Sequence, residues 1–170
     1  MNRRRRTAMA AIVLLGMAQP ASADVIVDWN KKAVDFIVNH KMSPPSAERL
    51  LAMTHAAMYD AVNSIEHKYR PYLVELPTSA TASQEAAAAT AAGTVLAGAN
   101  PAAQPELNAA LTAYLAAIPD SAAKAEGVKL GEAVAVKMLA ARTNDGANAP
   151  RTSVRILATG DRYPQWRHRR

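Results

Sequence analysis

Residues 46–65 (SAERLLAMTHAAMYDAVNSI) constrain the fold most, because they form the longest unbroken helical pattern with large side chains in the chain. On a helical wheel, the apolar stripe covers about one third of the circumference, the width that a core-facing helix needs. The opposite side holds Met53 and Ala57 with only Arg49 and Asp60 as charged residues. We therefore predict a central helix covered on two sides. Its stripe comprises Leu50, Leu51, Thr54, Met58, Ala61, Val62 and Ile65.

The start of this helix is well marked. Ser43 or Ser46 can cap it, and the two prolines between them suit a first helical turn, where the missing N–H needs no partner. Before it, residues 28–40 place Trp29 and other apolar side chains at helical spacing, with charged residues elsewhere. This pattern predicts a short amphipathic helix that Asp28 opens and that lies against the central helix.

Three more helical patterns follow. Residues 83–96 open with a serine cap and are mostly alanine, a strong helix former with little side chain to bury. Residues 101–118 repeat apolar side chains at helical spacing and end at a proline, and residues 121–143 follow a cap at Asp120 or Ser121. The apolar face predicted for the last helix comprises Val128, Ala135, Val136 and Leu139.

Between the central helix and the alanine-rich segment, residues 66–81 hold two prolines and two tyrosines, which suits an extended loop. A loop of this length inside a domain usually covers a core edge or reaches a partner. Five helices, one long loop and no convincing strand pair predict an all-α helical bundle. The chain has no cysteine, so we expect packing alone to hold it.

The first 23 residues have the order of a secretory signal peptide: basic residues 3–6, an apolar run at 8–18 and a small-residue cleavage site at 21–23. The apolar run is too short to span a bilayer comfortably. We predict its removal before Asp24 and a periplasmic or secreted protein without a stable membrane span. The adjacent arginines leave twin-arginine export open beside the general route.

Charge is distributed unevenly. The whole chain carries a formal net charge of +6, but residues 24–150 hold 10 basic and 13 acidic side chains. This middle part has neither a basic stripe nor interleaved aromatic residues, which argues against a nucleic-acid partner.

At residues 47–63 (AERLLAMTHAAMYDAVN), with DWN at 28–30 and YRPYLVELP at 69–77, the chain resembles the N-terminal helical half of bacterial secreted vanadium-dependent haloperoxidases. These enzymes belong to the superfamily of type 2 phosphatidic acid phosphatases. The resemblance covers about residues 24–150. It implies a helical N-terminal domain of haloperoxidase or phosphatase type over that range.

The family's chemistry depends on three motifs, K-x6-RP, PSGH and SR-x5-H, whose cations and donors hold vanadate or phosphate. None of them occurs in this chain, and Arg70 with its following proline has Asn63 where the lysine would stand. The resemblance therefore implies that vanadate or phosphate would be bound by a missing C-terminal half. We predict no catalytic, cofactor-binding or metal-binding residue in this chain.

Composition changes abruptly at Pro150. Residues 151–170 pack six arginines into twenty positions without a period of 2 or 3.6. Residues 151–170 can be back-translated with different synonymous codons. One such choice, read from the third base of the Arg151 codon, encodes a proline-rich sequence. That sequence is similar to the connection that precedes the catalytic half in the resembling family. We predict that this tail is disordered, and a shifted reading frame is a further hypothesis.

A few residues still invite a functional interpretation. His55 shares a helix flank with Glu48 and Tyr59, but a metal site needs two or three converging ligands, so we expect a boundary histidine bonded to one of these two residues or to a backbone carbonyl. His40 and His67 lie near predicted helix ends, where the helix dipole favours them.

No GxSxG or HExxH motif occurs in the chain. Gly127 and Gly131 lie four residues apart in a helical pattern and predict a close helix contact.

The functional hypothesis is an exported N-terminal portion of a haloperoxidase-like or acid-phosphatase-like protein, inactive alone, whose partner is the C-terminal half or a second copy. The alternative is a self-sufficient periplasmic helical module that binds a protein through residues 66–81. The gene sequence downstream distinguishes them, since only the first hypothesis requires the three anion motifs there.

Overall fold

The computed structural model describes residues 24–147. Within that range the chain forms five α-helices and one short 3-10 turn, with no strand, so the predicted all-α fold is confirmed. The predicted signal peptide at 1–23 and the predicted tail at 151–170 lie outside the described residues. The elements are α1 (Val25–Asn39), α2 (Pro44–Glu66), α3 (Gln84–Ala99), η1 (Pro101–Ala103), α4 (Gln104–Ala116) and α5 (Ala122–Ala141).

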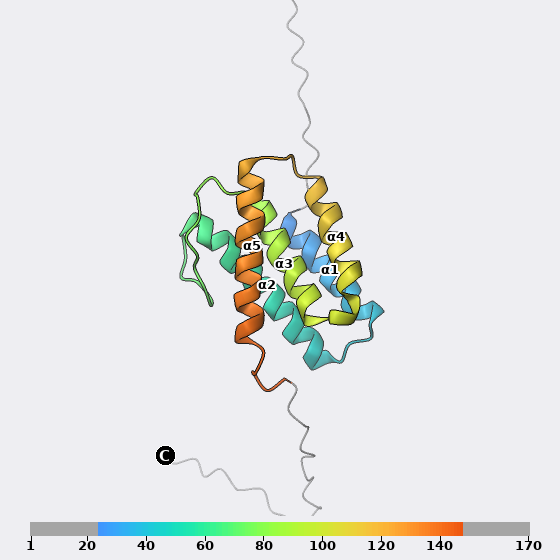
Figure 1. Ribbon diagram of the computed structural model, residues 1–170. Coiled ribbons are helices and arrows are strands. Elements are labelled where there is room, and N and C mark those ends of the chain that lie inside the picture. Colours follow the sequence, from blue (N-terminus) through green and yellow to red (C-terminus); the bar gives the residue numbers. More distant parts are fainter. Residues whose placement is uncertain (1–23, 148–170) are drawn as a thin grey trace, which may run out of the picture.

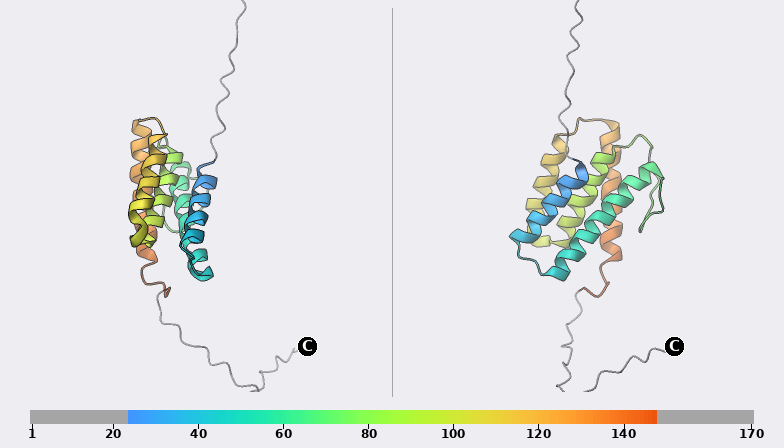
Figure 2. Two further views of the ribbon diagram at one scale, coloured as in Figure 1. Left: turned by 90° about the vertical axis from the view of Figure 1, so that its right-hand side faces the viewer. Right: turned by 180° about the vertical axis from the view of Figure 1, so that it is seen from behind.

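Helix α3 lies at the centre, with α1 and α2 on one side and α4 and α5 on the other (Figures 1 and 2). Eleven of its sixteen residues are buried, and most of these are alanines. The prediction that α2 is the central helix is therefore wrong. Because alanine has a small side chain, other helices can approach α3 closely from both sides. The sequence-based prediction instead chose α2, because α2 has more large apolar residues.

The core has two apolar clusters, and α3 supplies side chains to both. Trp29 and Phe36 of α1 pack in the first cluster with Leu96 of α3 and Leu107 of α4. The second cluster joins α2, α3 and α5 around Met138. Helix α2 supplies side chains to both clusters, so the prediction that it is covered on two sides is confirmed: Leu50 and Met58 enter the first, and Met53, Ala57, Ala61 and Ile65 the second.

Helices α3 and α5 touch at the two glycines that the sequence singled out. A Cβ atom on Gly127 would lie 2.4 Å from the carbonyl oxygen of Ser83, and one on Gly131 would lie 2.4 Å from that of Ala87. Both contacts are far inside van der Waals distance, so only glycine allows the two backbones to come this close. The predicted close helix contact is confirmed.

Two of the predicted helix starts need correction. Asp24, not Asp28, caps α1: its Oδ1 accepts the backbone N–H of Ile26 at 3.0 Å. Helix α2 begins at Pro44, and the hydroxyl of Ser43 makes no capping bond but pairs with Ser46. The caps of α3 and α5 are as predicted, since Ser83 and Ser121 each accept a backbone N–H of the first turn.

The outer helices also differ from expectation. Helix α4 starts only after η1, and Leu107 is its one buried residue. On α5, Val136 was predicted to face the core but is 60% exposed. The buried face instead follows the glycines, because they set where α5 meets α3: it comprises Gly127, Leu130, Gly131, Val134, Ala135 and Met138.

Candidate functional site

The loop after α2 is fastened by Asp60, a fully buried residue on that helix. One carboxylate oxygen of Asp60 accepts the backbone N–H of Tyr72 at 2.7 Å, and the other accepts those of Leu73 and Val74 at 2.9 and 3.0 Å. Hydrogen bonds to a charged acceptor are stronger than those between neutral groups. Asp60 therefore holds three consecutive residues of the loop against α2.

Two further side chains of α2 hold the start of the same loop. Asn63 pairs with both backbone groups of Tyr69, donating to its carbonyl at 2.7 Å and accepting from its N–H at 2.9 Å. The hydroxyl of Tyr59 donates to the carbonyl of Arg70 at 2.8 Å. Tyr59, Asp60 and Asn63 of α2 thus position the loop that follows the helix.

A cluster of arginines ties the end of α5 to α2 and to this loop. Arg49 donates to the carboxylate of Asp145 at 2.9 Å and to the carbonyl of Arg142 at 2.8 Å. Arg142 in turn donates to the Tyr72 hydroxyl at 2.6 Å. The hydrogen bond from Arg49, with a second from the backbone N–H of Ala147, holds the pKa of Asp145 below its usual value. Both guanidinium groups are therefore engaged within the fold.

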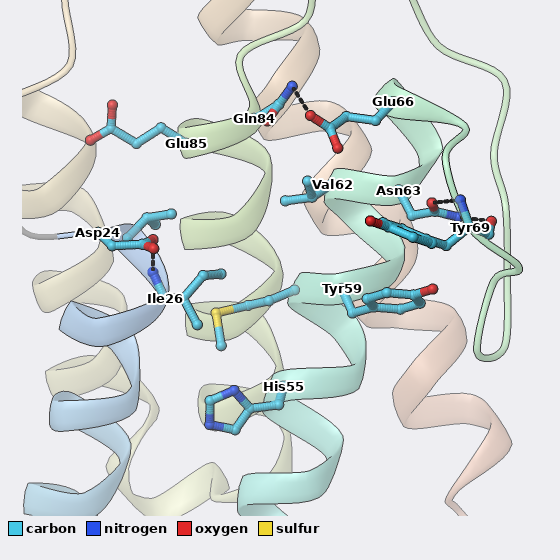
Figure 3. Close-up of a pocket in the computed structure, with 12 residues that line it drawn as sticks. Asp24, Ile26, His55, Tyr59, Val62, Asn63, Glu66, Tyr69, Gln84 and Glu85 are labelled. Atoms are coloured by element: carbon cyan, nitrogen blue, oxygen red, sulfur yellow. Dashed lines mark hydrogen bonds between the residues drawn. The ribbon is translucent and has the colours of Figure 1, made fainter.

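A cleft of about 730 Å³ lies between α1 and α2. Figure 3 shows Asp24 and Ile26 of α1 on one side, Tyr59 and Val62 of α2 on the other, and the start of α3 at one end. Its lining comprises Asp24, Val25, Ile26, His55, Met58, Tyr59, Val62, Asn63, Glu66, Tyr69, Gln84 and Glu85.

The cleft is acidic. Asp24, Glu66 and Glu85 line it, and no lysine or arginine does. Nearby, Tyr114 donates to Glu85 at 3.3 Å, and its pKa is raised to about 12 by burial first and then by the negative charges of Glu85, Asp28 and Asp24. Negative charge thus accumulates where α1, α2 and α3 meet.

Each histidine flagged in the sequence has a structural partner. His55 pairs through Nε2 with the side-chain oxygen of Asn30 on α1 at 3.0 Å, so the predicted bond to Glu48, Tyr59 or a carbonyl is wrong. The sequence could not indicate this partner, because it lies 25 residues away on another helix. His40 and His67 occupy the C-terminal caps of α1 and α2, which confirms their predicted places at helix ends.

Within residues 24–147, no three acidic or histidine side chains gather closely enough to hold a metal ion. Among the helices of that part, none is long and apolar enough to cross a membrane. No family model, no curated protein and no solved structure matches the chain.

Proposed function

We propose that this chain is the N-terminal, non-catalytic helical portion of an exported vanadium-dependent haloperoxidase-like or acid-phosphatase-like protein. The sequence resemblance at residues 47–63 motivates the proposal. The contacts of those residues support it, because Tyr59, Asp60 and Asn63 form hydrogen bonds with the backbone of the loop that follows α2. Residues with this structural role can account for a family resemblance without taking part in the family's chemistry.

The acidity of the main cleft is the observation that carries the proposal. A vanadate or phosphate site needs several fixed cations to balance the oxyanion and the charge that develops in its transition state. The cleft offers three carboxylates and no lysine or arginine. Arg49 and Arg142, which line a smaller cavity of about 210 Å³, already bind Asp145 and Tyr72. The cleft therefore repels an oxyanion, and the two arginines beside the smaller cavity are already engaged.

Turnover measurements test the proposal. The purified protein, with its N-terminus defined by intact mass, should show background rates for bromide oxidation with vanadate and peroxide and for phosphate-ester hydrolysis. A turnover that disappears in Arg49→Ala or Arg142→Ala would refute the proposal. Asp35→Ala, an exposed change on α1, is the matched control.

The second candidate is a protein-binding module, and the exposure of the loop favours it. Tyr69 and Tyr72 are 68% and 58% exposed, although Asn63 and Asp60 fix the backbone beneath them. Rigidly held tyrosines supply contact area at a low cost in side-chain entropy. Sequencing the gene downstream separates the candidates: K-x6-RP, PSGH and SR-x5-H in an open frame support the first, and unrelated sequence supports the second.

A further inference from the structure

The cleft between α1 and α2 has three carboxylates on three different elements. Asp24 precedes α1, Glu66 ends α2, and Glu85 lies in the first turn of α3. Figure 3 shows them spread around one end of the cleft rather than converging on a single point. Spread carboxylates suit a ligand with several separated positive charges better than one compact ion.

Between the carboxylates, the wall of the cleft is apolar. Ile26 of α1 and Val62 of α2 lie on its two sides (Figure 3), and Met58 of α2 also lines it. Part of this surface belongs to the packed core, since Met58 is buried in the first apolar cluster. A hydrocarbon chain bound here would be transferred from water onto an apolar surface that is already formed.

The carboxylates have few cationic partners in the part of the chain that the structure describes. Glu85 accepts a hydrogen bond from the neutral hydroxyl of Tyr114, and Asp24 accepts the backbone N–H of Ile26. Only Glu66 pairs with a lysine, Lys68, which is largely exposed and lies outside the cleft lining. An exposed pair of this kind contributes little and exchanges readily.

We propose that this cleft binds a linear aliphatic polyamine. Its ammonium groups lie against Glu66, Glu85 and Asp24, and its methylene chain lies over Ile26 and Val62. An anion is repelled by the same carboxylates, and a neutral apolar ligand leaves them without a partner. The volume of about 730 Å³ falls in the range of small-molecule sites, which is about 300–1,000 Å³.

Calorimetric titration of the purified protein with spermidine tests this inference. We expect saturable 1:1 binding that weakens about tenfold in Glu85→Gln and in Glu66→Gln, because each change removes one charge-assisted contact. The matched control is Glu132→Gln, which removes an exposed carboxylate of α5 outside the cleft and should leave the affinity unchanged. Circular dichroism of each variant verifies that it folds.

Two other titrations distinguish this binding from general attraction between charges. Butylamine, with one charge, and Mg²⁺, with two charges at one point, should each bind at least about tenfold more weakly than spermidine at the same ionic strength. The proposal is overturned if spermidine does not bind, if Mg²⁺ binds as tightly, or if Glu132→Gln weakens binding as much as Glu85→Gln.

Discussion

Asp60 lies in the middle of a helix whose other inward-facing residues are mostly apolar, and its burial is stabilised by three backbone N–H groups of the loop. A buried carboxylate without such donors would be strongly unfavourable. The sequence pattern places Asp60 on the side of the helix opposite the main apolar stripe, a side that we predicted to be covered by other parts of the protein. Local pattern could not reveal its role, because its partners lie 12 to 14 residues away in a loop without periodicity.

We predict that Asp60→Ala lowers the free energy of unfolding by about 3 kcal/mol or more, since hydrogen bonds to charged groups contribute roughly 1.5–3 kcal/mol each. Urea unfolding measures this change. The control is Asp35→Ala, which removes an exposed partner of Lys31 and should change stability by less than about 0.5 kcal/mol. Equal effects of the two substitutions would show that Asp60 does not hold the loop.

Tyr114 supplies a second prediction at the scale of a single residue. Its pKa is about 12 in the folded protein and about 10 in an unfolded chain, so folding favours the neutral phenol. The stabilisation is therefore complete below pH 10 and is lost as the pH rises from 10 to 12. Ultraviolet titration of the wild type against Tyr114→Phe isolates this phenol.

Glu85→Gln should lower the pKa of Tyr114 only in part, because burial is the larger cause of the shift and remains. A Tyr114 phenol that ionises near pH 10 in the wild type would contradict the assigned surroundings.

At the scale of elements, helix starts with a serine cap could be predicted, as Ser83 and Ser121 show. The arrangement of the helices in the bundle could not be predicted. Helix α3 is central because its small side chains allow close packing, and it lacks the large apolar residues that usually indicate a core helix. The only sequence signal for this packing was the pair Gly127 and Gly131, which identified a close contact without its partner. The cleft was missed for the same reason: α1, α2 and α3 each supply part of its lining, and no single segment contains its pattern.

The glycine contact leads to a prediction with an internal control. Gly131→Ala should destabilise the fold by about 1–3 kcal/mol, since the new Cβ meets the carbonyl oxygen of Ala87, which cannot move without moving α3. Gly98→Ala also places a Cβ 2.4 Å from an atom, but that atom is the flexible end of Leu139.

In a helix interior, as at Gly131, alanine is favoured over glycine by about 1 kcal/mol, and Gly98, next to the last residue of α3, gains no more than that. We therefore expect Gly98→Ala to be neutral or stabilising while Gly131→Ala lowers the thermal midpoint. Equal shifts in both variants would mean that backbone contact does not set the distance between α3 and α5.

At the scale of the whole molecule, charge is distributed unevenly along the chain. Residues 24–150 contain more acids than bases, although the chain as a whole is basic. The described fold places three of these acids around the cleft between α1 and α2 and engages Arg49 and Arg142 in contacts between elements. This arrangement is unsuited to oxyanions, which agrees with the proposal that the chain is a non-catalytic portion of a longer protein.

Vanadate binding tests that proposal most directly. Titrating the purified protein into orthovanadate and following the vanadium NMR signal measures binding without requiring turnover. We predict no saturable loss or broadening of the free signal at millimolar protein, because three carboxylates repel the anion and both clustered arginines are engaged. Saturable binding that Arg49→Ala or Arg142→Ala abolishes, and Asp35→Ala leaves intact, would contradict the account.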